Sequence, residues 1–230
     1  MISKVPLFKK ILGSNWDLLH PAIQQRFAAY PATETSLTYR GELRIMYCSK
    51  FGKIIAMLTR PLLQGALMPY CAHHVPVEVK IYTKKNSPFL FKERTYRVPG
   101  KAPIQFLSYM KASKNNDVLE YVGKGIGVKL HLFVKHGHLH FKSKGYFWDI
   151  GFYRIPIPRL LTPGVIHVDH IHATPNQFHI QIYIIHPLFG KIFRQSGTFK
   201  HINDARRARL VRYLRYQVRK NVIDHRRVHV

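Results

Sequence analysis

The chain has 230 residues, with 37 Lys+Arg against 11 Asp+Glu, and therefore a formal net charge of +26. Hydrophobic residues make up 46% of it and aromatic residues 13%, which is typical of a packed globular protein and excludes a disordered basic tail. The length suffices for one large domain with its own core, and the charge excludes an acidic scaffold and favours an anionic partner.

The sequence contains no evident targeting or membrane-spanning segment. Lys9 and Lys10 interrupt the apolar stretch near the N-terminus, so we expect no signal peptide. The most apolar segment, 51–71, includes charged residues and Pro61, and it falls short of the ~18 apolar residues of a spanning helix. We therefore expect a cytoplasmic protein, with peripheral contact to a membrane as a further expectation.

The first third of the chain combines helical segments with one strand. Residues 6–30 have a helical pattern, in which Pro21 suits the first position of a helix. Residues 37–47 alternate between apolar and polar side chains and predict a half-buried strand. Residues 51–68 are apolar and mostly unbranched, which predicts a helix that is kinked or restarted at Pro61.

From residue 75 to residue 199, short alternating segments are separated by turn residues. The clearest pair forms a hairpin over 126–144, with His136 and Gly137 at its turn. We expect a further strand over 146–153, followed by a proline-rich loop over 155–163. About nine short strands at this spacing predict an α+β fold: a strongly curved antiparallel sheet or open β-barrel with helices packed against it.

The last 30 residues differ from this body. Residues 201–230 hold nine Lys+Arg and two Asp+Glu, and residues 203–222 have a helical period. We therefore expect a basic C-terminal helix appended to a single domain that spans residues 1–200. The arginines beside its apolar stripe are candidate anion-binding residues: Arg206, Arg209, Arg212, Arg215 and Arg219.

Several motifs along the chain occur in one known family. They are Leu-Phe-Lys-Lys-Ile-Leu-Gly at 7–13, Leu-Leu-His-Pro-Ala-Ile at 18–23, Tyr-Arg-Gly at 39–41, the apolar segment 51–68, Gly-Tyr at 145–146, Pro-Ile-Pro-Arg-Leu-Leu-Thr-Pro at 156–163, and the segment that begins His-Pro-Leu-Phe-Gly at 186–197. In this combination the chain resembles the bacterial domain-of-unknown-function family 4166, over roughly residues 6–200. The resemblance implies one domain and no chemistry, since the family has no assigned reaction.

The residue types do not form a recognisable catalytic or metal site. No Ser-His-Asp or Cys-His arrangement has a recognisable local context, and carboxylates are scarce. Asp149 lies in a bulky apolar run, where a buried carboxylate needs a partner such as Arg154 or Arg159. We therefore predict no catalytic residue and no cofactor.

Histidine and cysteine are the residue types that could form a metal site or a cross-link. Two histidine pairs have i, i+2 spacing, His138/His140 and His170/His172, and they can meet at a metal only if their strands are neighbours. A solvent-exposed strand face that happens to use histidine is the explanation we favour. The two cysteines, Cys48 and Cys71, could form a single disulfide. We predict no metal site.

The apolar helical segment and the proline-rich loop are the best candidates for a ligand site. In a curved sheet, such a helix either fills the concave face or covers a pocket. If it covers a pocket, the loop could form the opposite side of the entrance. The candidate ligand-binding residues are Ile54, Met57, Leu58, Leu62, Ile157, Arg159 and Leu160.

These features favour a non-enzymatic binding module for a hydrophobic or amphipathic small molecule that works near an anionic membrane surface. The alternative is a nucleic-acid-binding basic protein, and a further alternative is an enzyme acting on a small ligand. For nucleic acid, the expected contacts are the outward lysines of the central strands: Lys129, Lys135, Lys142 and Lys144. The oligomeric state stays open.

Overall fold

A computed structural model describes residues 6–29, 36–61, 63, 67–113, 115–174 and 176–202. Three α-helices lie within these residues: α1 (Leu7–Leu12), α2 (Pro21–Ala28) and α3 (Lys50–Thr59). Short 3-10 turns cover Gly13–Leu18 and Arg159–Leu161. The strands are β1 (Ser36–Cys48), β2 (Val75–Thr83), β3 (Leu90–Tyr96), β4 (Ile104–Ala112), β5 (Val118–Gly123), β6 (Ile126–Lys135), β7 (His138–Asp149), β8 (Arg154–Ile157), β9 (Val165–Thr174), β10 (Gln177–His186) and β11 (Gly190–Ile202).

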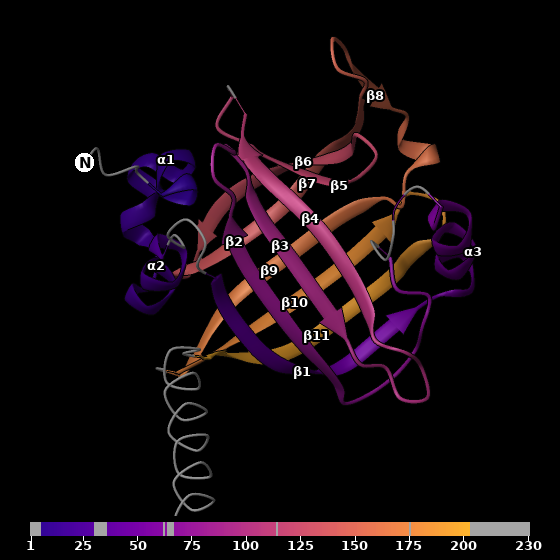
Figure 1. The fold of residues 1–230 in the computed structure, drawn as a ribbon, viewed down its shortest axis with the longest axis horizontal. Helices are drawn as coiled ribbons and strands as arrows, with labels where there is room; N and C mark the ends of the chain where they lie inside the picture. The colour runs from indigo at the N-terminus through magenta and orange to yellow at the C-terminus, as the bar shows by residue number, and fades with distance from the viewer. Residues whose placement is uncertain are drawn as a thin grey trace, which may run out of the picture.

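The strands form a closed antiparallel barrel (Figure 1). Ten of the eleven strands in the described residues follow the order β6-β5-β4-β3-β2-β1-β11-β10-β9-β7, and the pairing of β6 with β7 closes the ring. The eleventh, β8, pairs with β7 outside this ring. The prediction of an antiparallel, strongly curved sheet with packed helices is confirmed, whereas the open edge and the count of about nine strands are wrong.

The closure depends on β7, a single strand where the sequence predicts two. We expected separate strands over 138–144 and 146–153, but one strand continues to Asp149 with a bulge opposite Lys129 and Leu130. The bulge lets the first part of β7 pair with β9 while the second part pairs with β8. One irregular strand therefore belongs to the ring and also pairs with β8 outside it. Because β8 overlaps the start of the predicted loop 155–163, that part of the loop prediction is wrong.

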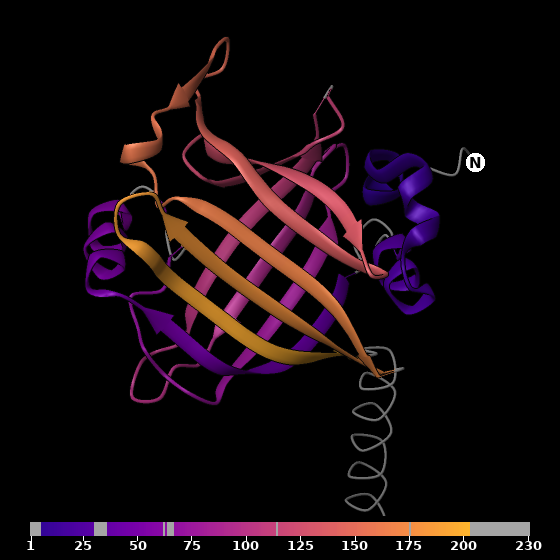
Figure 2. The same cartoon turned by 180° about the vertical axis from the view of Figure 1, so that it is seen from behind.

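The helices cover opposite ends of the barrel (Figures 1 and 2). At the start of β1, α2 begins with Pro21, and His20 caps it because its Nδ1 accepts a hydrogen bond from the N–H of Ala22 at 3.2 Å. At the far end of β1, Ser49 caps α3 by accepting a hydrogen bond from the N–H of Gly52 at 3.0 Å.

The predicted helix over 51–68 is shorter in the structure. It ends at Thr59, because Pro61 has no N–H to donate and its ring crowds the preceding turn. Within the described residues, no helix is both long and apolar enough to cross a membrane. The predicted C-terminal helix, with its five arginines, falls in residues 203–230 and lies outside the described residues.

Candidate binding cavity inside the barrel

Two cavities formed by described residues lie inside the barrel. The smaller one, of about 140 Å³, lies toward α1 and α2, which contribute Phe8, Arg26 and Phe27 to its wall. The larger one, of about 300 Å³, lies toward α3 and the segment after it, which contribute Thr59, Leu63, Leu67 and Met68. Four residues line both cavities, which therefore lie against each other along the barrel: Arg94, Glu120, Val168 and Ile182.

A charged cluster projects into the interior from one wall. Glu120 of β5 accepts hydrogen bonds at one carboxylate oxygen, Oε1: Lys92 Nζ lies at 2.9 Å, Arg94 Nη2 at 3.4 Å and Ser108 Oγ at 2.8 Å. Lys92 and Arg94 alternate with outward residues on β3, so both point inward beside Leu90 and Tyr96. Two cations and one carboxylate therefore meet inside the barrel.

Burial and mutual attraction set the protonation of this cluster. Burial alone would raise the pKa of Glu120, but Lys92 and Arg94 outweigh it and lower this pKa to about 2. Burial, and then repulsion from Arg94, lower the pKa of Lys92 to about 8, although Glu120 opposes them. The carboxylate is thus firmly ionised near neutral pH, whereas the burial of a second cation is unfavourable.

The opposite wall is apolar. Going round the ring, β9 lies five strands from β3, so the two stand on opposite sides of the interior. Three cross-strand pairs follow one another along β9 and β10, and they run from the smaller cavity to the larger one: His170/Ile180, Val168/Ile182 and Ile166/Ile184. The interior therefore has one charged wall and one wall that is apolar apart from His170 at its end.

Two segments with apolar sequences line one end of the larger cavity. The proline-rich loop contributes Ile157, Leu161, Thr162 and Pro163, and the segment after α3 contributes Leu63, Leu67 and Met68. Of the candidate ligand-binding residues, Ile157 lines this cavity, and Arg159 lines a shallow hollow on the outer surface. The others in the described residues are largely exposed: Ile54, Met57, Leu58 and Leu160. Leu62 lies outside the described residues.

The two histidine pairs do not face each other. Their strands are neighbours, but the register sets Leu139 opposite His170 and His140 opposite Asp169. His140 therefore faces outward, where its Nδ1 lies 2.7 Å from Asp169 Oδ1, whereas His170 lines the smaller cavity. No group of three or more potential metal ligands occurs among the described residues. Cys48 and Cys71 are free thiols.

Asp149 has the partner that its sequence context required. Its Oδ2 accepts a hydrogen bond from Tyr121 Oη at 2.8 Å and lies 3.3 Å from Arg154 Nη2. The first of these bonds, more than any other contact, lowers the pKa of Asp149. This group lies where β7 meets β8, away from the interior, and it joins the eleventh strand to the barrel.

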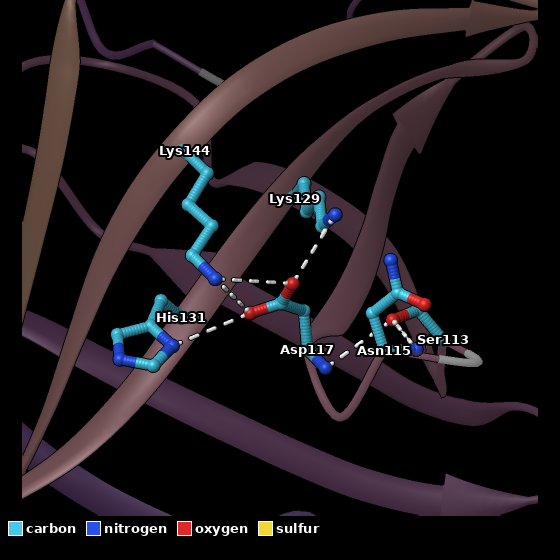
Figure 3. A network of polar contacts seen from close by, with 6 residues as sticks. All are labelled: Ser113, Asn115, Asp117, Lys129, His131 and Lys144. Atoms are coloured by element: carbon cyan, nitrogen blue, oxygen red, sulfur yellow. Dashed lines mark hydrogen bonds and ion pairs between the residues drawn. The ribbon is translucent and has the colours of Figure 1, made fainter.

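A second polar network, outside the two cavities, joins the residue before β5 to β6 and β7 (Figure 3). Asp117 is 1% exposed, and its carboxylate lies 3.2 Å from Lys129 Nζ, 3.0 Å from Lys144 Nζ and 3.4 Å from His131 Nδ1. Burial would raise the pKa of Asp117, but hydrogen bonds from the two lysines lower it. Lys129 and Lys144, which we predicted as contacts to nucleic acid, thus hold an internal carboxylate. Nucleic-acid binding stays a prediction that no particular contact favours.

The charged residues of the interior were not identified from the sequence. Lys92 and Arg94 occupy inward positions of β3, and Glu120 lies in the apolar run 118–122. A carboxylate within such a run is a usable signal, since it needs buried cations as partners. Arg26 carries no comparable signal, because a single arginine in a short helix is ordinarily solvated.

One comparison with known proteins identifies the family. The model of a family described as "Domain of unknown function (DUF4166)" matches residues 19–199, which include all eleven strands except the end of β11. A search of curated proteins finds no match. Because the family model covers more than half of the chain, the protein belongs to the DUF4166 family, as its motifs indicated.

Proposed function

We propose that this protein is a non-enzymatic binding protein that holds a hydrophobic or amphipathic small molecule inside its barrel. The observation that carries the proposal is the larger cavity, whose volume of about 300 Å³ matches the lower end of the ~300–1,000 Å³ range of small-molecule sites. Its wall is predominantly apolar, and its charged groups, Arg94 and Glu120, lie on barrel strands.

The number of strands explains why space remains inside. A barrel of about eight strands is just wide enough for its side chains to fill it or to hold one small ligand, and its diameter grows with strand number. The ten-stranded ring is wider, and the mostly medium-sized inward residues of β9 and β10 do not fill it. An apolar ligand is the occupant that such a wall favours.

The test is a titration with an anilinonaphthalene-sulfonate, an amphiphilic anionic fluorophore whose emission rises in apolar surroundings. We expect saturable enhancement with one site per chain, together with displacement by a long-chain fatty acid. Denatured protein at the same concentration is the control for nonspecific enhancement. A folded protein that gives no saturable signal and binds no fatty acid would contradict the proposal.

We also propose that the end of the barrel at α3 contacts a membrane surface, where it would exchange its ligand. Large apolar side chains of α3 and of the neighbouring 3-10 turn are between 54% and 78% exposed, and they form what we call the apolar rim: Ile54, Met57, Leu58, Leu160 and Leu161. The rim lies beside the larger cavity, because Leu161 and the adjacent Thr59 line it. The net charge of +26 favours an anionic bilayer.

Liposome flotation tests the membrane proposal. We expect more protein to float with vesicles that contain anionic lipid than with neutral vesicles. Replacing Met57 and Leu58 together by serine is expected to reduce recovery several-fold, because exposed apolar side chains at an interface add to electrostatic attraction. The control is Leu107→Ser on the outer face of β4. Equal recovery of all three proteins with both kinds of vesicle would refute membrane contact.

A further inference from the structure

The smaller cavity contains more positive than negative charge. Arg26, Lys92 and Arg94 line it together with a single carboxylate, Glu120, which already contacts the last two. No salt bridge joins Arg26 to any residue that the structure describes. A buried guanidinium without a carboxylate is costly, so the cavity is electrostatically prepared for an anion.

Arg26 is held in position by aromatic rings. Its guanidinium carbon lies 3.8 Å from the centroid of Phe178 and 5.3 Å from that of Phe27. These contacts fix the planar group through its faces and use none of its N–H donors. The Nε and Nη2 atoms of Arg26 are buried and have no hydrogen-bond partner among the described residues.

Two further nitrogens line the same cavity without a partner in the described part of the chain. They are Nη1 of Arg94 and Nδ1 of His170. His170 lies between aromatic rings, with its centroid 5.0 Å from that of Phe27 and 5.6 Å from that of Phe141. Burial, followed by repulsion from Arg26, Lys92 and Arg94, holds the pKa of His170 well below its ordinary value, which agrees with convergence of these cations on the imidazole.

Buried polar atoms almost always have partners, so several unpaired nitrogens around one cavity call for a ligand with hydrogen-bond acceptors. Because two of the groups are guanidinium ions, the acceptor that fits best is an anion, and a carboxylate matches their paired N–H groups. A volume of about 140 Å³ accommodates a small head group and a few carbon atoms. The rest of a longer ligand must therefore lie outside the smaller cavity.

The apolar wall of β9 and β10 offers that path. It begins at His170 and Ile180 beside the cations and passes Val168 and Ile182, which line both cavities. It then reaches Ile166 and Ile184 in the larger cavity. An extended hydrocarbon chain along this wall would stay on the side of the barrel opposite Lys92 and Glu120.

We propose that the ligand is a single-chain amphiphilic carboxylate, with its head group against Arg26, Arg94 and His170 and its hydrocarbon chain along β9 and β10 into the larger cavity. This assignment rests on the proposed function and specifies the ligand class of the same site. It adds a binding site for a charged head group, which a cavity for purely apolar molecules would not require.

The test compares dodecanoate with dodecanol, which has the same chain length and no charge, by isothermal titration calorimetry. The wild-type protein is expected to bind dodecanoate about 10- to 100-fold more tightly, the usual effect of a hydrogen bond to a charged group. Arg26→Leu is expected to remove most of this preference and to leave dodecanol binding nearly unchanged. Dodecyl phosphate is the third ligand, and tighter binding of it than of dodecanoate would overturn the carboxylate assignment.

The controls separate loss of the site from loss of the fold. Arg44→Leu, on an exposed position of β1, is expected to behave as wild type. Thermal unfolding of Arg26→Leu should occur at or above the wild-type temperature, because the variant loses a buried, unpaired charge. Equal affinity of the wild type for dodecanoate and dodecanol would overturn the head-group assignment while the proposed function stands. Failure to bind any of the three ligands would refute the proposed function itself.

Discussion

Replacing Glu120 by glutamine is expected to lower the free energy of unfolding by about 3–5 kcal/mol at pH 7, the usual cost of breaking a buried ion pair by removing one partner. The amide has nearly the same shape as the carboxylate, so the change removes charge and little volume. Lys92 and Arg94 would then face each other inside the barrel without a counter-ion. Chemical denaturation measured by tryptophan fluorescence gives the difference directly.

The pH dependence of this effect has a definite sign. The pKa of Glu120 falls from 4.5 to about 2 on folding, so between these values the unfolded chain binds more protons than the folded one. The stability that the carboxylate contributes is therefore fully present above about pH 4.5 and is lost as the pH falls toward 2. We expect the difference between wild type and Glu120→Gln to shrink over the same interval.

Two further variants make the test specific. Glu93→Gln changes a carboxylate on the outward face of the same barrel wall and is expected to change stability by less than about 1 kcal/mol. Adding Lys92→Met to Glu120→Gln removes one of the two uncompensated cations and should restore part of the lost stability. If Glu120→Gln is no less stable than Glu93→Gln, the charged cluster does not have the role that we assign to it.

Replacing Ile182 by tryptophan is expected to weaken binding of the naphthalene-sulfonate fluorophore or of dodecanoate by about tenfold or more. Ile182 lines both cavities and belongs to the wall that we assign to the hydrocarbon chain. The larger side chain would occupy space that the ligand needs, because well-packed interiors yield little to an added ring. Titration of the variant beside wild type, at matched concentrations of folded protein, measures the loss.

The matched control is Ile185→Trp, three residues further along β10. Ile185 is 40% exposed and lines an outer hollow rather than either interior cavity. This variant should bind as wild type does, although it adds the same ring to the same strand. Equal weakening of binding by both substitutions would mean that the ligand lies elsewhere or that tryptophan in β10 disturbs the whole barrel.

The strands could be predicted from the sequence because the signal for a strand is local. Residues 37–47 alternate in side-chain polarity, and the hairpin over 126–144 has His136 and Gly137 at its turn with φ angles of 51° and 74°, as two-residue hairpins require. Closure is a different kind of property. It depends on β6 pairing with both β5 and β7 and on the bulge in β7, and neither is encoded in a short window of sequence.

The site was only partly predictable for a related reason. The apolar segment after residue 51 and the proline-rich loop do line the larger cavity, but helical spacing did not indicate which side chains face it. Met57 and Leu58 point to solvent, whereas Leu63 and Met68 line the wall. The polar residues of the interior interrupt the alternation on which strand prediction depends, so Lys92 and Arg94 were not recognised as inward-facing.

Photochemical cross-linking tests the central claim, that the barrel interior holds an amphiphile, most directly. The full-length protein would be saturated with a dodecanoate analogue that carries a diazirine in its chain, irradiated, digested and examined by mass spectrometry. We predict one adduct per chain, located in peptides from β9 and β10 at the inward residues Val168, Ile182 or Ile184 and suppressed by excess dodecanoate. Adducts confined to outward residues, or labelling that dodecanoate does not suppress, would contradict it.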